Sequence, residues 1–287
     1  MALFGDRGIQ IKTPDQIRAM RVAGLVVGET LEMLRGAVAP GITTAELDRL
    51  AEDSIRSRGA TPSFLGYGEP PFPASICASV NDEVVHGIPG DRVLREGDVI
   101  SIDCGAIVDG WHGDAAITVG VGEIAPEISA LLEATERALW AGLSAVRAGG
   151  RVSDISHAVE QSVRTASPGD AGSAGGYGIV EDYTGHGIGT AMHMAPDVPN
   201  YGRPGRGPRL KPGIALAVEP MVTLGDPATG IAEDEWTVVT LDGGWAAHYE
   251  HTFALTESGV WVLTARDGGR ARLAELGAPF GGDVDII

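Results

Sequence analysis

The sequence has few cysteines and no long apolar runs, the features typical of secreted and membrane proteins. Its 287 residues include only two cysteines, Cys77 and Cys104, which cannot form a disulfide framework. No apolar run approaches the length of a membrane span, and no basic start followed by an apolar core marks a signal peptide. We therefore expect a cytoplasmic protein with free thiols.

Positive charge is scarce as well. Lysine and arginine total 21 against 39 aspartates and glutamates, which gives a formal net charge of −18. A protein that binds nucleic acid through bulk charge needs the opposite balance. We therefore expect neither direct nucleic-acid readout nor a membrane partner.

Three familiar catalytic signatures are missing. The chain has no Gly-x-Ser-x-Gly elbow, no Walker phosphate loop and no His-Glu-x-x-His helix. Its GHGIGT run lacks the spacing of a dinucleotide fingerprint. Serine, phosphate and cofactor chemistries of those kinds therefore lose support.

One stretch that is present predicts a β-hairpin. The run SIDCGAIVDGWHGD, residues 101–114, has alternating apolar residues on either side of Asp109-Gly110. Asp-Gly between such runs is a strong short-range hairpin signal. If these two residues form the turn, Val108 pairs with Trp111 and every later pairing is fixed.

This register brings two aspartates together. Gly105 falls opposite Asp114, and Asp103 lies two positions further along the same strand, so the three share one face. Gly105 has no side chain and is expected to leave the space beside them open. Two carboxylates this close repel each other unless a cation or a proton lies between them. The hairpin therefore requires a partner for its two charges.

The order of elements predicts an α+β fold. Periodicity and capping signals predict helices at about 14–34, 44–58, 126–147 and 153–165, the last capped by Ser153-Asp154. Strands are expected at 76–85, on both sides of the hairpin turn, and at 215–218, 237–241 and 249–256. Helices on the outside of an antiparallel sheet are the simplest arrangement of such runs.

The same order suggests a repeat. Two helices followed by strands occur twice, which predicts halves at about 1–125 and 126–265 that form one catalytic domain, 1–265. The Gly-rich run 167–178 is expected to be a loop, and 266–287 a peripheral tail. A site made by both halves would lie on the sheet where they meet.

Further residues could complete a site with the two aspartates. The candidates are His86 in VHGIP, His186 in GHGIG, His193, Glu219 after ALAV, and Glu250 in YEHT. Each has a structural explanation when taken alone; histidines in loops, for example, are often solvated. A carboxylate at the end of a buried strand, such as Glu219, is however rarely buried without a partner.

Taken together the candidates indicate a metal centre. Four carboxylates and one imidazole are available, from Asp103, Asp114, His186, Glu219 and Glu250. A single zinc prefers fewer ligands and more nitrogen or sulfur. This set suits two divalent ions of the harder kind, such as manganese, iron or cobalt, bridged by carboxylates and a hydroxide. The remaining histidines are expected to be structural or at the surface: His112, His157, His248 and His251.

The chain resembles the type I methionine aminopeptidases of the short bacterial form. The resemblance runs from about residue 11 to residue 263, on IKTPDQIRAMRVAG, VNDEVVHGIPG, GDVISIDCGAIVDGWHGD, YTGHGIGTAMHMAP, KPGIALAVEPMV, DEWTVVT and YEHT. It implies the pita-bread fold, in which two pseudo-symmetric halves hold a dimetal site between them. That implication agrees with the repeat of helices and strands.

The resemblance also implies how the metal ligands divide. Asp114 and Glu250 would bridge two divalent ions, which could be cobalt, manganese, iron or zinc. Asp103 would serve one ion, and His186 and Glu219 the other. Asn81 matches a position whose carbonyl holds a monovalent cation in some relatives.

Catalytic and substrate-binding roles follow from the same resemblance. His193 would hydrogen-bond the scissile amide, His86 would contact the substrate backbone near the leaving nitrogen, and Glu219 would also move protons. The walls of the methionine pocket would be Tyr67, Phe72, Cys77 and Trp236. Without the resemblance, Cys77 is better explained as a small core residue than as a nucleophile. Met192 stands where relatives often carry an aromatic residue, and a flexible methionine there would reshape the pocket wall.

The implied activity is metal-dependent removal of an N-terminal methionine when the following residue is small. Two metals lower the pKa of a shared water, so that the bridging hydroxide attacks the scissile carbonyl. They also bind the free amine of the substrate, and this requirement produces an exopeptidase. We expect nascent polypeptides as partners, met near the ribosome exit, and a monomeric enzyme.

Two alternatives carry different expectations. A proline-directed peptidase of the same fold, a prolidase or aminopeptidase P, usually has a further N-terminal domain, whereas the catalytic pattern here begins near residue 11. A non-catalytic pita-bread module that binds peptides, histones or ribosomes would have lost metal ligands. All five are present in this chain.

Overall fold

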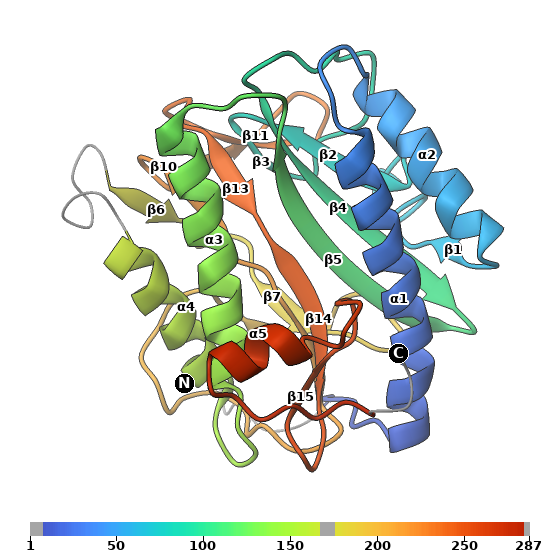
Figure 1. Cartoon of the computed structure of the whole chain (residues 1–287), viewed down its shortest axis with the longest axis vertical. Helices are drawn as coiled ribbons and strands as arrows, with labels where there is room; N and C mark the ends of the chain where they lie inside the picture. Colours follow the sequence, from blue (N-terminus) through green and yellow to red (C-terminus); the bar gives the residue numbers. More distant parts are fainter. Residues whose placement is uncertain (1–7, 167–175, 284–287) are drawn as a thin grey trace.

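A nine-stranded antiparallel sheet forms the centre of the molecule (Figure 1). The computed structural model describes residues 8–166 and 176–283. The main path of the sheet runs β1-β4-β5-β14-β9-β7-β8, with β2 added beside β4 and β15 beside β14. Two small three-stranded sheets, β13-β10-β6 and β11-β12-β3, stand beside it.

The bounds of the elements are as follows. The helices are α1 (Pro14–Ala37), α2 (Thr44–Ser57), α3 (Pro126–Ala145), α4 (Val152–Ala166) and α5 (Arg270–Glu275). The strands of the first half are β1 (Thr61–Pro62), β2 (Ile76–Val80), β3 (Glu83–Val85), β4 (Val99–Val108) and β5 (Trp111–Gly120). Then come β6 (Tyr177–Ile179), β7 (Gly185–Gly187), β8 (Met194–Val198), β9 (Ala215–Val218) and β10 (Met221–Leu224). The last are β11 (Thr229–Ile231), β12 (Val238–Thr240), β13 (Ala246–His248), β14 (Glu250–Leu255) and β15 (Val260–Val262).

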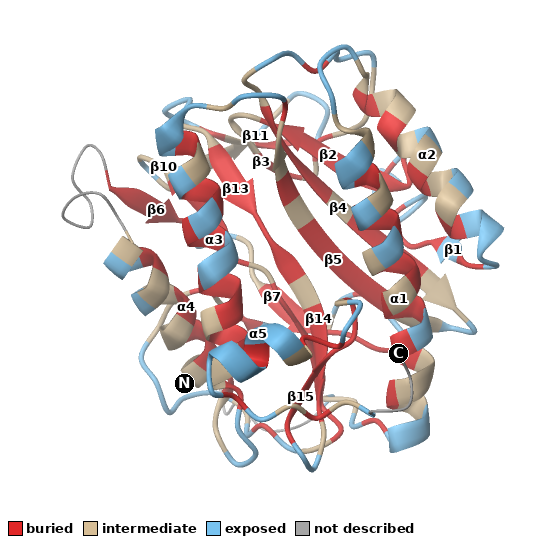
Figure 2. Ribbon diagram, in the orientation of Figure 1, coloured by how far each residue is buried: buried red, intermediate tan, exposed pale blue. Residues whose placement is uncertain are grey.

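The predicted α+β class with outer helices is confirmed. In Figure 1, α1 crosses in front of β4 and β5, while α3 lies over the part of the sheet that contains β14. Figure 2 shows the central strands and the inner faces of these helices buried and their outer faces exposed. Of the helices in the described residues, none is long and apolar enough to cross a membrane.

The helix starts follow from local chemistry, with one correction. Thr13 and Thr43 each form a complete capping box, and the box at Thr43 is the predicted one. The prediction that Ser153-Asp154 caps α4 is wrong, because the helix already begins at Val152. The Asp154 carboxylate instead accepts a hydrogen bond from the Arg151 backbone amide, as an acid in the first helical turn can do.

The central hairpin has the predicted register. Asp109 and Gly110 form its two-residue turn with φ angles of 49° and 81°, and a type I′ turn requires φ to be positive at both positions. Val108 pairs with Trp111, and Gly105 pairs with Asp114. Asp103 and Asp114 therefore lie on one face of the sheet.

Helix α1 approaches this hairpin with no side chain between the two backbones. A Cβ atom built on Gly113 would lie 2.7 Å from the backbone nitrogen of Gly24 in α1. One built on Gly24 would lie 2.7 Å from the carbonyl carbon of Leu263. Glycine at position 113 lets the helix seat directly on the strand that carries Asp114, and Gly24 lets the same helix approach the backbone of Leu263.

Two other expectations need correction. The strand expected over 76–85 is divided into β2 and β3, because Asn81 turns the chain with a φ of 62°. The segment after residue 265 is packed rather than peripheral: Leu273 of α5 is fully buried, and Phe280 bridges to Val260. Residues 167–175 of the loop expected at 167–178, and residues 284–287 of the tail, lie outside the described residues.

Candidate metal centre

Five adjacent strands each bring one of the predicted ligands to the same region. Asp103 comes from β4, Asp114 from β5, Glu250 from β14 and His186 from β7, while Glu219 directly follows β9. Glu250 pairs with Ala116, which also pairs with Asp103, so their side chains share the face of Asp114. The sheet itself therefore sets the spacing of the donor atoms.

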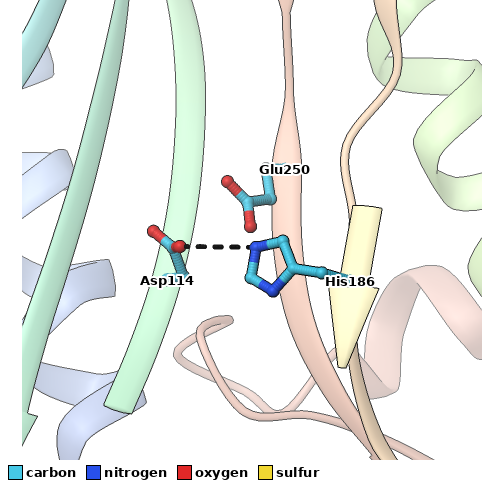
Figure 3. Close-up of side chains that lie close together, drawn as sticks. All are labelled: Asp114, His186 and Glu250. Atoms are coloured by element: carbon cyan, nitrogen blue, oxygen red, sulfur yellow. Dashed lines mark ion pairs between the residues drawn. The ribbon is translucent and has the colours of Figure 1, made fainter. Parts of the chain in front are cut away.

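Three of these residues form the tightest group. The ligand atoms of Asp114, His186 and Glu250 all lie within 4.8 Å of one another, and all three residues are buried. Figure 3 shows the three side chains pointing toward one another from β5, β7 and β14. Nε2 of His186 lies 3.9 Å from Oδ2 of Asp114 and 3.5 Å from Oε1 of Glu219.

The protonation state of His186 indicates that a cation belongs among these donor atoms. Nδ1 of His186 lies 3.0 Å from the carbonyl oxygen of Gly187, which can only accept, so Nδ1 carries the proton. Burial lowers the pKa of His186 to about 4, so the ring is neutral near pH 7. The lone pair of Nε2 then faces carboxylate oxygens, which is unfavourable unless a cation lies between them.

The carboxylates show the same need for a cation. Burial raises the pKa of Asp103 to about 7. Burial, followed by the charges of Glu250 and Asp103, raises the pKa of Asp114 well above its ordinary value. Burial, then the charges of neighbouring carboxylates, also raises the pKa values of Glu219 and Glu250. Four acids that resist ionisation together are a site that a divalent ion would stabilise.

Buried atoms without partners support this fit. Among the described residues, Oδ1 of Asp103, Oδ1 of Asp114 and Oε1 of Glu250 are buried and form no hydrogen bond. Buried polar atoms usually have partners, so oxygens without them need an explanation such as an ion. Carboxylate oxygens with one imidazole are the donors that manganese, iron and cobalt accept. The residues present therefore fit the metal that the sequence predicts.

A cavity of about 270 Å³ opens onto this group. Besides the metal donors, six of the predicted site residues line the cavity: Tyr67, Phe72, Cys77, His86, His193 and Trp236. The Phe72 and Trp236 rings meet edge to face at 5.2 Å, and His86 contacts Trp236 in the same way at 6.0 Å. The cavity thus has an aromatic wall and an acidic floor.

Two histidines at this cavity are held differently. His86 has a φ of 60°, its ring meets Tyr183 at 5.5 Å, and burial lowers its pKa to about 4. His193 lies at the exposed rim, where its Nδ1 is 2.6 Å from the Tyr67 hydroxyl. The His193 ring lies 4.4 Å from that of His186, next to the metal donors.

The expectations for Gly105 and Met192 need revision. A Cβ atom on Gly105 would lie 2.9 Å from atoms of Met192, Phe64 and Ser63, so side chains from elsewhere fill the space expected to be open. Met192 is almost fully buried and is not among the residues that line the cavity. It packs in one cluster with Phe64, Phe72 and Cys77, which line the cavity.

The carbonyl of Asn81 already has a protein partner. It accepts a hydrogen bond of 2.9 Å from the Ala246 amide. The Asn81 side chain bonds to Asp98 and to the Val99 backbone amide. These bonds fix the turn that separates β2 from β3.

Sequence reasoning missed two residues that shape the site. His248, expected to be structural or at the surface, is buried in the cavity wall with Nε2 3.9 Å from Oε2 of Glu219. The Thr252 hydroxyl donates to the Asp114 carbonyl at 2.7 Å and lies 3.2 Å from its amide. His248 lies two residues before Glu250, and Thr252 lies two residues after it. The alternation of side chains along β14, which puts Thr252 on the same face as Glu250, was the sequence feature that could have indicated Thr252.

The molecule has a larger cleft that lacks this chemistry. A cleft of about 700 Å³ lies between α1 and α3, lined by Tyr249 and His251 among others. Those two residues flank Glu250 along the strand, so the cleft opens on the opposite face of the sheet. Its acidic residues Glu29 and Glu32 pair with arginines. Converging donors rather than size therefore mark the site.

Comparison with known proteins agrees with this geometry. The chain matches the model of metallopeptidase family M24 over residues 18–257. It is 52% identical to a methionine aminopeptidase of Clostridium acetobutylicum over 257 residues, which cover 89% of this chain and 98% of the relative. The crystal structure of methionine aminopeptidase from Rickettsia prowazekii superposes with a TM-score of 0.84 at 38% identity, over 90% of this chain and all of that one.

A more distant likeness shows the fold alone. An Xaa-Pro dipeptidase from Bacillus anthracis superposes with a TM-score of 0.68 over 88% of this chain and 61% of that one. The two sequences are 23% identical. A shared fold at this distance does not carry a shared substrate.

Proposed function

This chain belongs to metallopeptidase family M24, and on that premise we propose that it is a methionine aminopeptidase. It is a hydrolase that removes the N-terminal methionine of proteins and peptides when the next residue is small. The observation that carries the proposal is the 52% identity to a methionine aminopeptidase along nearly the whole of both chains. The five converging donors supply the chemistry that a metallopeptidase needs.

The donors divide between two divalent ions as the resemblance implies. Asp103, Asp114, His186, Glu219 and Glu250 would hold these ions. Bound divalent ions lower the pKa of water and polarise carbonyl groups. Each half of the domain 1–265 would contribute part of the set, because Asp103 and Asp114 precede residue 125 and the other three follow it.

The side chains of the cavity bind and orient the substrate. Its acidic floor favours the α-ammonium group of a peptide N-terminus, which internal peptide bonds lack. The wall of Tyr67, Phe72, Cys77 and Trp236 accepts the unbranched methionine side chain. An extra or missing methylene in such a pocket changes binding by only about 1–3 kcal/mol, so close analogues of methionine are cleaved too.

Proton transfer and charge stabilisation come from three residues at the cavity. His193 donates a hydrogen bond to the substrate carbonyl oxygen, where negative charge develops. Glu219 holds and returns the proton that the leaving amine needs. His86 contacts the substrate backbone near the leaving nitrogen. These assignments rest on the match of each residue to the family motifs.

The physiological setting follows from this activity. The substrates would be nascent polypeptide N-termini, met in the cytoplasm near the ribosome exit by a monomeric enzyme. A monovalent cation near Asn81 would be a further ligand, bound through the free lone pair of the carbonyl that also accepts the Ala246 amide. These parts of the proposal rest on the sequence.

The test is hydrolysis of Met-Ala-Ser and of Xaa-Pro peptides by metal-free protein reconstituted anaerobically with manganese, iron, cobalt or zinc. We expect cleavage of Met-Ala-Ser with at least one metal and little cleavage of Xaa-Pro. Preference for Xaa-Pro peptides would overturn the substrate assignment. No turnover with any metal would favour a non-catalytic binding module.

A further inference from the structure

The hydroxyl of Tyr67 has a contact that a pocket wall does not need. It lies 2.6 Å from Nδ1 of His193, and the two rings are 5.3 Å apart. Tyr67 lies in the loop between β1 and β2, whereas His193 directly precedes β8, 126 residues later. An apolar wall for methionine would require only the ring of Tyr67, so the hydroxyl has a separate use.

The direction of this hydrogen bond depends on which nitrogen of the His193 ring carries the proton. A phenol with an ordinary pKa near 10 keeps its proton at neutral pH, and a neutral imidazole offers one acceptor nitrogen. The phenol can be the donor and Nδ1 the acceptor when the ring carries its proton on Nε2.

We propose that Tyr67 is a positioning residue that acts through His193. Its hydroxyl donates to Nδ1, so the proton of the neutral ring lies on Nε2, and Nε2 is the nitrogen left to face the substrate. The inference rests on the proposed function, because it explains how His193 presents a donor to the carbonyl oxygen. A ring with the opposite tautomer would present a lone pair and repel the charge that develops there.

The fixed ring also matters because His193 lies at the rim. Its side chain is exposed, so surrounding atoms restrict it on fewer sides than they restrict His186. A single short hydrogen bond then decides both the tautomer and the rotation of the ring. Positioning of this kind acts on the rate more than on substrate affinity.

A double-mutant cycle measures the coupling. Tyr67→Phe removes the hydroxyl and retains the ring. We expect it to lower kcat for Met-Ala-Ser about 10-fold, the loss of one hydrogen bond, with KM changed less than about 2-fold. In a His193→Ala background the same change should have no further effect, because its target is missing.

Two outcomes of the cycle would overturn the inference. A Tyr67→Phe variant with unchanged kcat would leave Tyr67 as a wall residue. An equal loss with and without the His193 side chain would mean that the hydroxyl acts on the substrate directly. Both outcomes leave the proposed methionine aminopeptidase activity intact.

A second measurement does not depend on turnover. In metal-free protein labelled with ¹⁵N, the signals of His193 are identified by their loss in a His193→Gln variant. We expect an unprotonated, hydrogen-bonded Nδ1 that shifts in Tyr67→Phe, while the signals of His157 stay in place. His157 is a suitable internal control because its Nδ1 faces the Gly202 carbonyl instead.

This readout separates the two levels of the argument. A proton on Nδ1 of His193, or an Nδ1 signal unchanged by Tyr67→Phe, would overturn the positioning role whatever the enzyme cleaves. The expected shift in a protein that does not cleave Met-Ala-Ser would support the hydrogen bond and contradict its use in this reaction. The inference therefore fails or stands separately from the proposed function.

Discussion

Asp103 and Asp114 lie on a ladder of ten consecutive residue pairs between β4 and β5, whereas His186 and His193 belong to a much less regular part of the sheet. Strands β7 and β8 share two pairs, Gly185 with Val198 and Gly187 with Met194, and the register shifts between them. The chain between these strands has no regular partner strand. The two sides of the metal centre are thus held by different means.

Side-chain and loop contacts hold the segment between His186 and His193. The Lys12 ammonium donates to the carbonyl of Ile188, and Gln10 bonds to Thr190. The Gly189 carbonyl accepts the backbone amide of His112. A ladder positions its residues through backbone pairing that repeats along two strands. The histidine side depends on single contacts from residues distant in sequence.

The largest expected effect on activity comes from changing Asp114, a proposed metal ligand on the β4-β5 ladder. Asp114→Asn removes one charge from a residue that we propose as a metal ligand, so we expect Met-Ala-Ser turnover to fall at least about 1,000-fold and metal content to decrease. Elemental analysis and steady-state kinetics measure both. Asp109→Asn is the matched control, because it makes the same chemical change at the exposed turn of the same hairpin. Full metal content in Asp114→Asn would contradict the ligand assignment.

The pH dependence of the metal-free protein should report the same carboxylates. Burial raises the pKa of Asp103 from its ordinary value of 3.8 to about 7. Between these two pH values the carboxyl group is protonated in the folded protein and ionised in the unfolded protein. The contribution of Asp103 to the free energy of unfolding should therefore fall as pH rises from about 4 to 7, whereas the buried His86 and His186, whose pKa values are lowered to about 4, contribute a rise over about pH 4 to 6.5. Denaturant titrations with and without divalent metal measure this slope, which bound metal should flatten. Asp103→Asn should remove the fall that Asp103 contributes and leave the rise from the histidines, and an unchanged slope in that variant would contradict the buried acid cluster.

The third prediction concerns the support of the ladder by α1. Gly113→Ala places a Cβ on the ladder strand against the backbone of Gly24 in α1, which should lower the free energy of unfolding by about 2 kcal/mol through overpacking. Gly36→Ala, on the same helix, meets no atom within 4 Å and should raise it by up to about 1 kcal/mol. Denaturant unfolding of both variants provides the measurement. Equal effects would mean that the close backbone contact does not stabilise the hairpin.

The comparison also explains which parts of the site the sequence predicts. The hairpin register follows from Asp109-Gly110 and strand alternation, which are local signals, and the structure confirms it. The space beside Gly105 is misjudged because Met192 and Phe64 reach it from other elements. His248 is missed for the same reason, since its contact with a carboxylate depends on tertiary packing. Motif resemblance, not periodicity, identifies the histidine side.

The smallest expected effect comes from loosening the histidine side without removing a ligand. Lys12 is buried and forms no ion pair with any described residue, and burial lowers its pKa to about 8. Lys12→Met removes the donor to Ile188. We expect kcat to fall about 10-fold, the loss of one charged hydrogen bond, with metal content unchanged because β7 still pairs with β9.

Stability should change in the opposite direction. Because the pKa of Lys12 in the folded protein lies below its ordinary value of 10.5, the charged ammonium destabilises the folded state. The free energy of unfolding of the wild type should therefore rise between about pH 8 and 10.5, as that charge is lost. Lys12→Met should lack this rise and be at least as stable as wild type at pH 7. Arg203→Met, at an exposed arginine, is the control for loss of one positive charge. A variant that loses stability while keeping full kcat would show that Lys12 supports the fold alone, and the contrast between the two sides of the centre would fail.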